Sequence, residues 1–340
     1  MTEGQNAASG YGVNKMFHPT LLAPDLVETA AFFRRVFGQE SSSSLAKFPT
    51  IESTFGMFTT IRDVLIDTIS PIRIKELMNV EFFSKEGIPH LSHTGWYVDQ
   101  DRIADLFYRL KDMGIRCVGP DSKVRDKPPV QGGDPAPFTL NGQINYVTSK
   151  LDTGVTYQFV PTSFGRSDNP NKGSHLAIDE RMDRGWTLPP EDPADPLGIV
   201  RCSHHTFLTR EPARALKFMV DVLGGTIIHE GRDELRATSS TYVALSDATF
   251  EYAVPDPGSD AERDLDSYPV QAEEPGFSHD TYHALTWTVA DLDKAAAHLE
   301  SAGVRIRARS GKALITEPST SMGIPWGFAS VHIPGDPRFA

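Results

Sequence analysis

Two histidines begin similar stretches of this chain, and each is followed at nearly the same distance by an acidic residue. His18 precedes Asp67 by 49 residues, and His204 precedes Glu251 by 47 residues. Imidazole and carboxylate side chains bind metal ions and transfer protons near neutral pH. A short apolar strand has no structural need of an imidazole at its start. We therefore ask which elements would place the two pairs in equivalent positions.

The residues after each histidine share several fixed offsets. An acid follows at the seventh position, a phenylalanine at the fourteenth and a glycine at the twentieth, namely Asp25 and Glu211, Phe32 and Phe218, Gly38 and Gly224. Apolar residues between them have helical spacing, and glycine is typical just beyond a helix. Asp67 and Glu251 each lie on a later apolar segment, four residues before a proline, in DTISP and EYAVP. We predict a strand, a helix and further strands in both copies.

Two weaker copies fill the rest of the chain. HTGWYVDQDRIADLFYRLKDMG begins at His93, and HALTWTVADLDKAAAHLESAG begins at His283. The predicted last strands of these copies are GVTYQFVP, which carries Gln158, and GFASVHIP. Such repeats define the architecture. We predict four units near 14–73, 88–161, 199–256 and 279–335, with a flexible tail at 1–13, an N-terminal domain at 14–161, a linker at 162–198 and a C-terminal domain at 199–340.

A repeated βαβββ unit with a histidine on its first strand and an acid on its last resembles the vicinal oxygen chelate superfamily. This superfamily includes glyoxalase I, methylmalonyl-CoA epimerase, bleomycin-resistance proteins and extradiol dioxygenases. The resemblance implies an α+β fold in which four βαβββ modules form two open, glyoxalase-like β-barrel domains. It also implies that metal ligands come from the first and last strands of each unit.

Carried over to this sequence, the resemblance implies a metal site in the first half. Its ligands would be His18, Asp67, His93 and Gln158, and Asp67 would also serve as the catalytic base. The second half offers His204 and Glu251 as further metal ligands. Two imidazoles with one carboxylate and one amide suit a divalent ion, either Fe(II), Zn, Mn, Co or Ni.

The fourth unit follows the pattern less well. His283 is one residue out of register with the neighbouring strand positions, and one residue of slip turns a side chain to the other face of a sheet. The acid position falls at Ser330, with His332 two residues later. The sequence also leaves open how the units pair. If units two and three paired, then His93, Gln158, His204 and Glu251 would form an alternative ligand set.

Three functions are compatible with these residues. The first is a redox-neutral, metal-dependent isomerase, epimerase or lyase whose substrate presents two neighbouring oxygens. The second is an Fe(II) extradiol-type dioxygenase that cleaves the ring of a catechol. The third is a metal-free protein that binds a small molecule, as in the bleomycin-resistance branch. Metal content and the dependence of activity on oxygen separate the three.

Composition restricts the partners. A net charge of -12 and a pI near 5.4 argue against nucleic acid and against an acidic membrane. Cys117 and Cys202 have neither the number nor the spacing of a disulfide framework. We expect a cytoplasmic protein with a small-molecule substrate, and a homodimer is possible.

Overall fold

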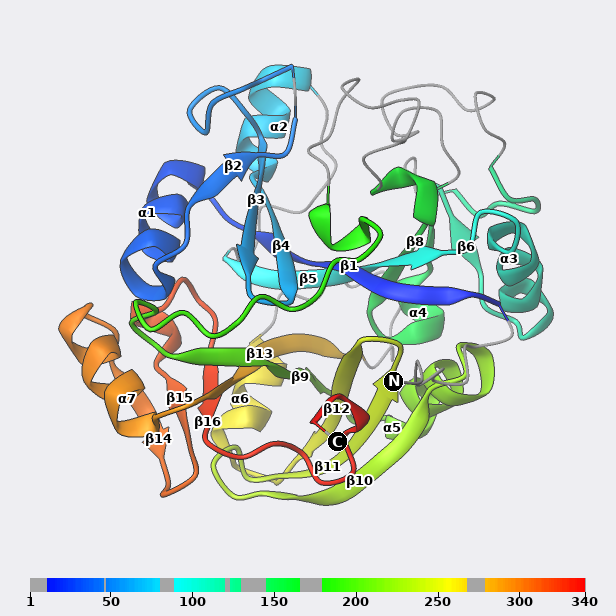
Figure 1. Cartoon of the computed structure of the whole chain (residues 1–340). Helices are drawn as coiled ribbons and strands as arrows, with labels where there is room; N and C mark the ends of the chain where they lie inside the picture. The colour runs from blue at the N-terminus through cyan, green and yellow to red at the C-terminus, as the bar shows by residue number, and fades with distance from the viewer. Residues whose placement is uncertain are drawn as a thin grey trace.

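The computed structural model describes residues 11–45, 47–79, 89–119, 123–129, 145–165, 179–267 and 279–339. Most of the predicted tail and part of the predicted linker lie outside these ranges. The described residues form two eight-stranded mixed sheets flanked by helices (Figure 1). Each sheet is built from two βαβββ units, so the predicted fold is confirmed.

The first sheet has the strand order β2-β3-β4-β1-β5-β8-β7-β6. Its first unit comprises β1 (Val13–Leu22), α1 (Leu26–Phe37), β2 (Ser41–Ser43), β3 (Gly56–Ile61) and β4 (Val64–Ile69). Its second unit comprises β5 (His90–Val98), α3 (Ile103–Asp112), β6 (Cys117–Val118), β7 (Tyr146–Thr148) and β8 (Thr156–Pro161). Two further helices, α2 (Pro71–Met78) and α4 (Lys150–Thr153), connect strands.

The second sheet repeats this order as β10-β11-β12-β9-β13-β16-β15-β14. The third unit comprises β9 (Ile199–Leu208), α5 (Pro212–Leu216) with a π-helical continuation (Lys217–Val222), β10 (Thr226–Asp233), β11 (Thr238–Leu245) and β12 (Ala248–Pro255). The fourth comprises β13 (Thr281–Val289), α7 (Leu292–Ser301), β14 (Ile306–Arg309), β15 (Ala313–Thr316) and β16 (Gly327–Ala329). Helix α6 (Asp260–Ser267) lies between the two units in sequence.

The first strands of paired units lie side by side at the centre of each sheet. Strand β1 pairs with β5, and β9 pairs with β13, both antiparallel. The last strand of each unit pairs in parallel with its own first strand, as β4 does with β1. Units one and two therefore share one sheet, and units three and four share the other. The alternative prediction, in which units two and three pair in one sheet, is therefore wrong.

Helix α1 shows how local sequence places an element. The Asp25 side chain accepts hydrogen bonds from two backbone N–H groups of the first turn, which satisfies donors that the helix leaves open. Gly38 ends the helix with φ of 66°, a left-handed conformation that suits glycine. The buried face carries Phe37, whose ring lies 6.2 Å from that of Trp287 in the other half.

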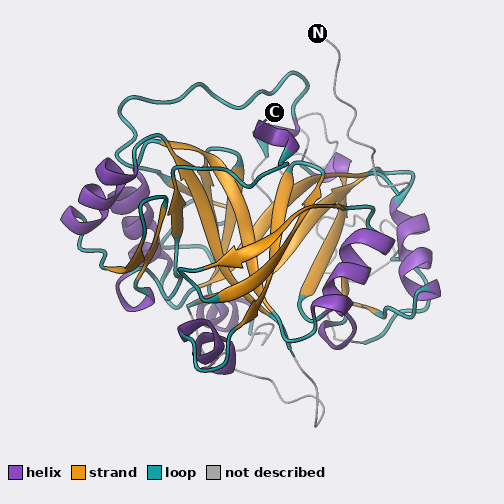
Figure 2. Cartoon of the chain, turned by 90° about the horizontal axis from the view of Figure 1, so that it is seen from below, coloured by secondary structure: helices purple, strands orange, loops and turns teal. Residues whose placement is uncertain are grey.

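The two halves share a core. Trp96 of the first sheet lies 5.3 Å from Phe250 of the second, measured between ring centroids. The Tyr157 and Tyr252 hydroxyls are 3.2 Å apart and hydrogen-bonded. In Figure 2 the strands of the two sheets occupy the middle of the molecule, and the helices lie around them. Each sheet therefore has an inner face toward the other half and an outer face, which we name the first outer face (bearing His18) and the second outer face (bearing His204).

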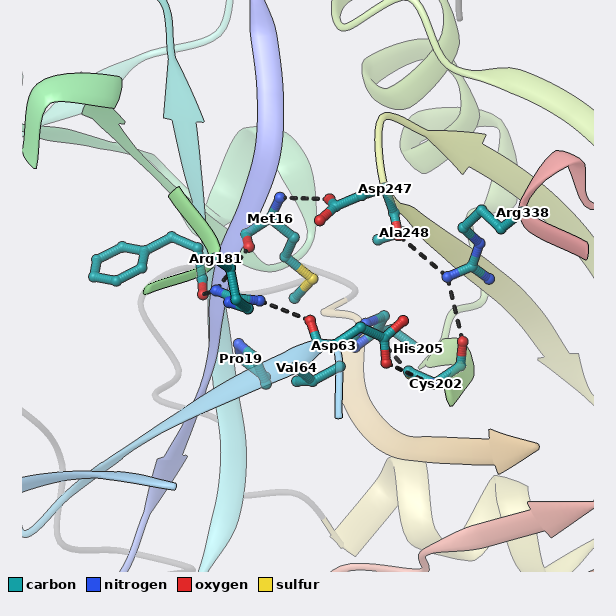
Figure 3. A pocket seen from close by; sticks show the side chains of 11 residues that line it. Met16, Pro19, Asp63, Val64, Arg181, Cys202, His205, Asp247, Ala248 and Arg338 are labelled. Carbon is teal, nitrogen blue, oxygen red and sulfur yellow. Dashed lines mark hydrogen bonds between the residues drawn. The ribbon is translucent and has the colours of Figure 1, made fainter. Parts of the chain in front are cut away.

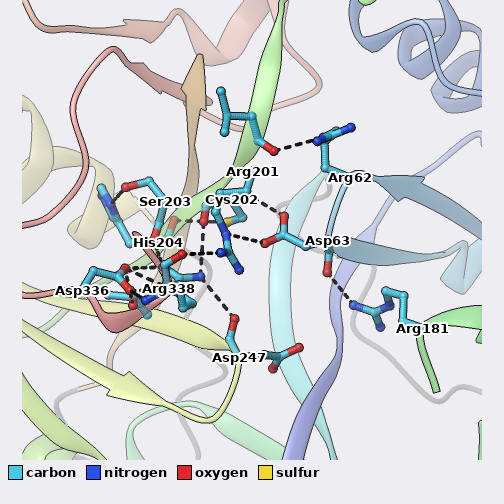
Figure 4. A network of polar contacts seen from close by, with 12 residues as sticks. Arg62, Asp63, Arg181, Arg201, Cys202, Ser203, His204, Asp247, Asp336 and Arg338 are labelled. Atoms are coloured by element: carbon cyan, nitrogen blue, oxygen red, sulfur yellow. Dashed lines mark hydrogen bonds and ion pairs between the residues drawn. The ribbon is translucent and has the colours of Figure 1, made fainter. Parts of the chain in front are cut away.

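Polar contacts join the two halves (Figure 4). The Asp63 carboxylate accepts a hydrogen bond from the backbone N–H of Cys202 at 2.8 Å. In return, the Asp247 carboxylate accepts one from the backbone N–H of Met16, also at 2.8 Å. These two bonds connect the turn before β4 with β9, and the turn before β12 with β1. We call the pair the reciprocal clasp.

Two buried arginines complete this junction. Arg181 donates to the carbonyl oxygens of Phe17 and Asp63, and Arg338 donates to those of Ser203 and Asp247. Each arginine also pairs with the aspartate two residues earlier, Asp179 or Asp336. Between them lies a cavity of about 10 Å³, lined by residues of both halves (Figure 3). The space suits one water molecule and no organic ligand.

Candidate functional site

The strand register places the four predicted ligands of the first half on the first outer face. His18 lies opposite Gly95, and Gly95 lies opposite Gln158. Asp67 lies opposite Thr20, which is two residues beyond His18. His93 precedes Gly95 by two residues on β5. Because residues opposite each other or two apart share a face of a sheet, the four side chains leave the sheet on one side.

A threonine hydroxyl lies between the two imidazoles. The Thr20 Oγ1 atom is 3.0 Å from His18 Nδ1 and 3.1 Å from His93 Nε2. The two rings are 5.9 Å apart between centroids, and both residues are buried. This contact leaves His18 Nε2 directed toward Gly95, where a side chain would come within 2.7 Å of it. The absence of a side chain at residue 95 therefore leaves room for the His18 ring.

Burial keeps both imidazoles neutral near pH 7. Desolvation holds the pKa of His18 well below its usual value of 6.5, and the charge of His93, when it is protonated, and that of Arg181 lower it further. Desolvation lowers the pKa of His93 to about 4. A neutral imidazole has a free lone pair and is the form that binds a metal ion. The environment therefore suits both residues to metal binding.

Asp67 and Gln158 complete the set. Burial raises the pKa of Asp67 from 3.8 to about 7. No hydrogen bond or ion pair of its carboxyl group occurs within the described part of the chain. The Gln158 amide donates to Asn145 Oδ1 at 3.1 Å. A half-buried carboxyl group without a cation is the kind of group that a bound ion would stabilise in its charged form.

The donor types of the first outer face thus fit a divalent ion. Among the described residues, however, no three His, Cys, Asp or Glu side chains are grouped closely enough to hold one. The side chains would have to move toward one another when the ion binds. Metal binding by the six residues named from the sequence therefore stays a prediction. They are His18, Asp67, His93, Gln158, His204 and Glu251.

The second outer face retains only half of the pattern. His204 lies opposite Thr286, which lies opposite Gly327, so Gly327 occupies the position of Gln158. Ala284, two residues before Thr286, occupies the position of His93. His204 and Glu251 are close, with 3.4 Å between Nε2 and Oε2. No third donor stands at either of the two other positions.

The structure corrects one assignment in the fourth unit and supports another. The last strand position lies at Gly327 and not at Ser330, which follows the end of β16 and is exposed. His332 is also exposed and stacks on Phe339, so it is no substitute ligand. His283 lies one residue before the position of His93, as predicted, and its Nε2 pairs with Asp264 at 2.9 Å.

A cluster of aromatic residues beside His18 was not predicted from the sequence. The Phe17 ring lies 4.3 Å from the His18 ring and 4.7 Å from the Tyr97 ring. Phe17 and Tyr97 pack in one cluster with Phe58, Leu65, Val160 and Phe164. Hydrophobic alternation along the strands could have indicated an apolar outer face. The Tyr97 hydroxyl already has a hydrogen-bond partner, because it donates to the Asp179 carboxylate at 3.3 Å.

Part of the chain matches a known protein family. Residues 201–317 match the family model described as the Glyoxalase/Bleomycin resistance protein/Dioxygenase superfamily. No curated protein matches the chain in sequence. Because the matched segment covers β9 to β15, the family signal lies in the second half.

Several solved structures are similar over nearly the whole chain. A mutant of 4-hydroxymandelate synthase from Streptomyces coelicolor has a TM-score of 0.58 at 12% identity, covering 95% of both chains. The 2,3-dioxygenase LapB from Pseudomonas sp. KL28 has a TM-score of 0.55 at 10% identity, covering 97% of this chain and 96% of its own. The Mn(II)-bound glyoxalase from Novosphingobium aromaticivorans has a TM-score of 0.53 at 13% identity, covering 96% of this chain and 86% of its own. At these identities the likeness shows a shared fold.

Among the described residues, no helix is long and apolar enough to cross a membrane.

Proposed function

Since this chain has the fold of the vicinal oxygen chelate superfamily, and residues 201–317 match the family model, we propose that it is a divalent-metal-dependent enzyme of the isomerase, epimerase or lyase type. Its substrate would be a small molecule with two neighbouring oxygen atoms. The metal would be held on the first outer face by His18, His93, Asp67 and Gln158.

One observation carries this proposal. His18 and His93 are both buried and share the Thr20 hydroxyl, on the same face as a carboxyl group without a cation. Burying two imidazoles beside a half-buried carboxyl group costs free energy unless the groups have a bound partner. The second outer face has Ala284 and Gly327 at two of the four positions and offers no such set.

The chemistry follows from the residue types. A bound divalent ion polarises a carbonyl oxygen and makes the hydrogen on the neighbouring carbon more acidic. Asp67 would accept that proton and return it to the product. Gln158 would orient the second oxygen of the substrate.

Elemental analysis of the freshly purified protein tests the location of the metal. We expect about one divalent ion per chain, which is lost in His18→Ala and in His93→Ala. His204→Ala is the matched control, because it removes an imidazole from the equivalent strand position of the other sheet. Circular dichroism checks that the three variants are folded. Loss of the metal in His204→Ala, with retention in His18→Ala, would contradict the proposal.

A second candidate is an Fe(II) dioxygenase that acts on a catecholic ring in the same place. Two histidines and one carboxylate are the donors of many non-haem iron oxygenases, and the similar structures include 2,3-dioxygenase LapB. Activity under strict anaerobiosis separates the two. The redox-neutral reaction continues without oxygen, whereas ring cleavage stops.

A third candidate is a metal-free protein that binds a small molecule. It is favoured by the absence, within the described ranges, of three acidic, histidine or cysteine side chains gathered around one point. Purified protein that contains no stoichiometric metal and does not take up added Zn, Fe(II), Mn, Co or Ni would support this candidate over the other two.

A further inference from the structure

A short motif recurs after the last strand of each half. It reads DER at residues 179–181 and DPR at residues 336–338. In both copies the aspartate carboxylate accepts a hydrogen bond from the backbone N–H of the arginine two residues later and pairs with its guanidinium group. Each copy also contributes to a single turn of 3₁₀ helix, Glu180–Met182 or Pro337–Phe339. We name this repeated element, which lies outside the four βαβββ units, the aspartate–arginine turn.

The first strand of each half contains one extra residue directly before its histidine. The residues on either side of Phe17 lie opposite two consecutive residues of β5, and those on either side of Ser203 lie opposite two consecutive residues of β13. Phe17 and Ser203 are thus β-bulges, which interrupt the hydrogen-bond ladder and change the direction of neighbouring side chains. Both residues are buried, so their carbonyl oxygens need donors other than bulk water.

The arginine of each aspartate–arginine turn supplies these donors. Arg181 donates to the carbonyl oxygen of Phe17 at 2.5 Å and to that of the preceding residue at 3.3 Å. Arg338 donates in the same way to the carbonyl oxygen of Ser203 and to that of the residue before it (Figure 4). Each arginine also donates to a carbonyl oxygen in the turn before β4 or before β12. The two arginines therefore hold equivalent bulges in the two halves.

Each bulge places its own side chain beside the histidine. The Phe17 and His18 rings are 4.3 Å apart between centroids and inclined at 71°. The Ser203 hydroxyl oxygen lies 3.0 Å from His204 Nδ1. In a regular strand, successive side chains point to opposite faces and do not meet in this way. The bulge, and not ordinary alternation, therefore sets the direction of both imidazoles.

The effect of Arg181 on His18 passes through the backbone. Within the described ranges, its guanidinium group forms hydrogen bonds with backbone carbonyl oxygens and with Asp179, and none with the His18 ring. Arg181 and Asp179 are 6% and 3% exposed. Because a planar guanidinium group presents its donors in a fixed fork, it holds these acceptors in one geometry.

We propose that Arg181 is a positioning residue, which sets the direction of the His18 imidazole by holding the backbone of the Phe17 bulge. Arg338 has the same role for His204 on the second outer face. The positioning itself is a property of the metal-free chain. Its consequence for metal binding rests on the proposed function, because His18 is a ligand only there.

NMR of ring-labelled histidines in the full chain, treated with a chelator, tests the proposal. His18→Ala and His204→Ala assign the two sets of ring signals. Arg181→Lys keeps the positive charge but replaces the planar fork by a compact ammonium group. We expect it to shift or broaden the ring signals of His18 and to leave those of His204 in place. Arg338→Lys is the matched control, and it should do the reverse.

Two results would overturn the proposal. The first is an unchanged His18 signal in a folded Arg181→Lys protein, and the second is an equal change at His18 and His204 in both lysine variants. Either result means that the arginines contribute to stability only. If Arg181→Lys does not fold, Asp179→Asn keeps the arginine and neutralises the carboxylate that holds it. We then expect a smaller displacement of the same His18 signals, and their constancy would count equally against the proposal.

Calorimetric titration with Zn²⁺ measures the consequence for metal binding. We expect Arg181→Lys to bind the ion roughly tenfold more weakly than the wild type, and Arg338→Lys to bind it as the wild type does. Equal affinities of the two variants would overturn this consequence. A wild-type chain that takes up no ion would contradict the proposed function, whereas the NMR comparison would still decide whether Arg181 positions His18.

Discussion

Gly95 lies directly opposite His18 across the central strand pair of the first sheet, and a Cβ atom on it would stand 2.7 Å from His18 Nε2. The second sheet has Thr286 opposite His204 at the equivalent position. A side chain is therefore compatible with the fold there. It is the His18 ring, and not the strand geometry, that requires glycine at residue 95.

Gly95→Ala should therefore disturb the first outer face. The added methyl group displaces the buried His18 ring, and overpacking of this kind costs typically 1–3 kcal/mol of unfolding free energy. Denaturant unfolding measures the change, and loss of bound metal should accompany it. Gly311→Ala is the control, because nothing lies within 4 Å of its Cβ position. Equal stability of the two variants would show that His18 has room to move.

Asp67 should give the metal-free protein an unusual dependence of stability on pH. Its pKa is about 7 in the folded protein against 3.8 ordinarily, so the folded state keeps a proton that the unfolded chain releases. This contribution to stability is complete below about pH 3.8 and is lost as the pH rises through 7. A shift of about 3 pKa units corresponds to roughly 4 kcal/mol, as an upper value for a half-buried group.

Asp67→Asn removes this dependence, so we expect the variant to be more stable than the wild type at pH 8 and closer to it in stability at pH 5. Denaturant unfolding with a chelator at both pH values measures the difference. Added divalent metal should reverse the order at pH 8 by stabilising the wild type only. If the variant is no more stable than the wild type at pH 8 without metal, the carboxyl group is better solvated than its surroundings indicate.

The reciprocal clasp should contribute strongly to stability. Asp63→Ala leaves the backbone N–H of Cys202 without its acceptor and removes the partner of Arg201, so we expect a loss of roughly 2–4 kcal/mol. Asp126→Ala removes an ion pair with Lys111 whose carboxylate is 91% exposed, and it should change stability by less than about 0.5 kcal/mol. A small effect of Asp63→Ala in denaturant unfolding would mean that water replaces the carboxylate at the junction.

Both cysteines should be inert toward thiol reagents in the native protein. Burial raises the pKa of Cys117 to about 12 and that of Cys202 well above its usual value. The thiolate is the reactive form, and neither sulfur forms a disulfide. We expect no labelling by a chromogenic disulfide reagent at pH 8 until denaturant is added, followed by two equivalents. Rapid native labelling would indicate local opening around one of the two strands.

The repeat was predictable because each unit carries its own local signals. Asp25 caps a helix and Gly38 ends it in a left-handed conformation, and both effects depend on a few neighbouring residues. The alternation that turns His204 and His205 to opposite faces of the sheet also follows from strand geometry alone. His205 indeed contacts Tyr282 on the inner face, with 2.5 Å between Nδ1 and the hydroxyl oxygen.

The last strand of the fourth unit was misread because a proline served as its marker. In the first and third units the acid lies four residues before a proline, and the same count in GFASVHIP gives Ser330. Strand β16 ends at Ala329, however, and the following residues turn toward the junction, where Arg338 binds. A contact with a distant strand decided the end of β16, and no local pattern reports such a contact.

The pairing of the units and the roles of Asp179 and Arg181 could not be predicted for the same reason. Both pairings place similar strands side by side, so only the packing of whole units selects one. Asp179 and Arg181 belong to a polar segment without periodicity, yet Arg181 is buried and bonds to the carbonyl oxygen of Phe17. Long-range hydrogen bonds to backbone atoms leave no signal in composition.

The reciprocal clasp has a consequence for how the polypeptide can be cut. Each half supplies the aspartate that the first strand of the other half requires, so either half alone exposes an unsatisfied amide and a broad apolar surface. Cleavage of the exposed stretch around Glu191 should therefore yield two fragments that stay together and recombine after separation. A half produced alone should associate with a second copy of itself, because that copy would cover the exposed apolar surface.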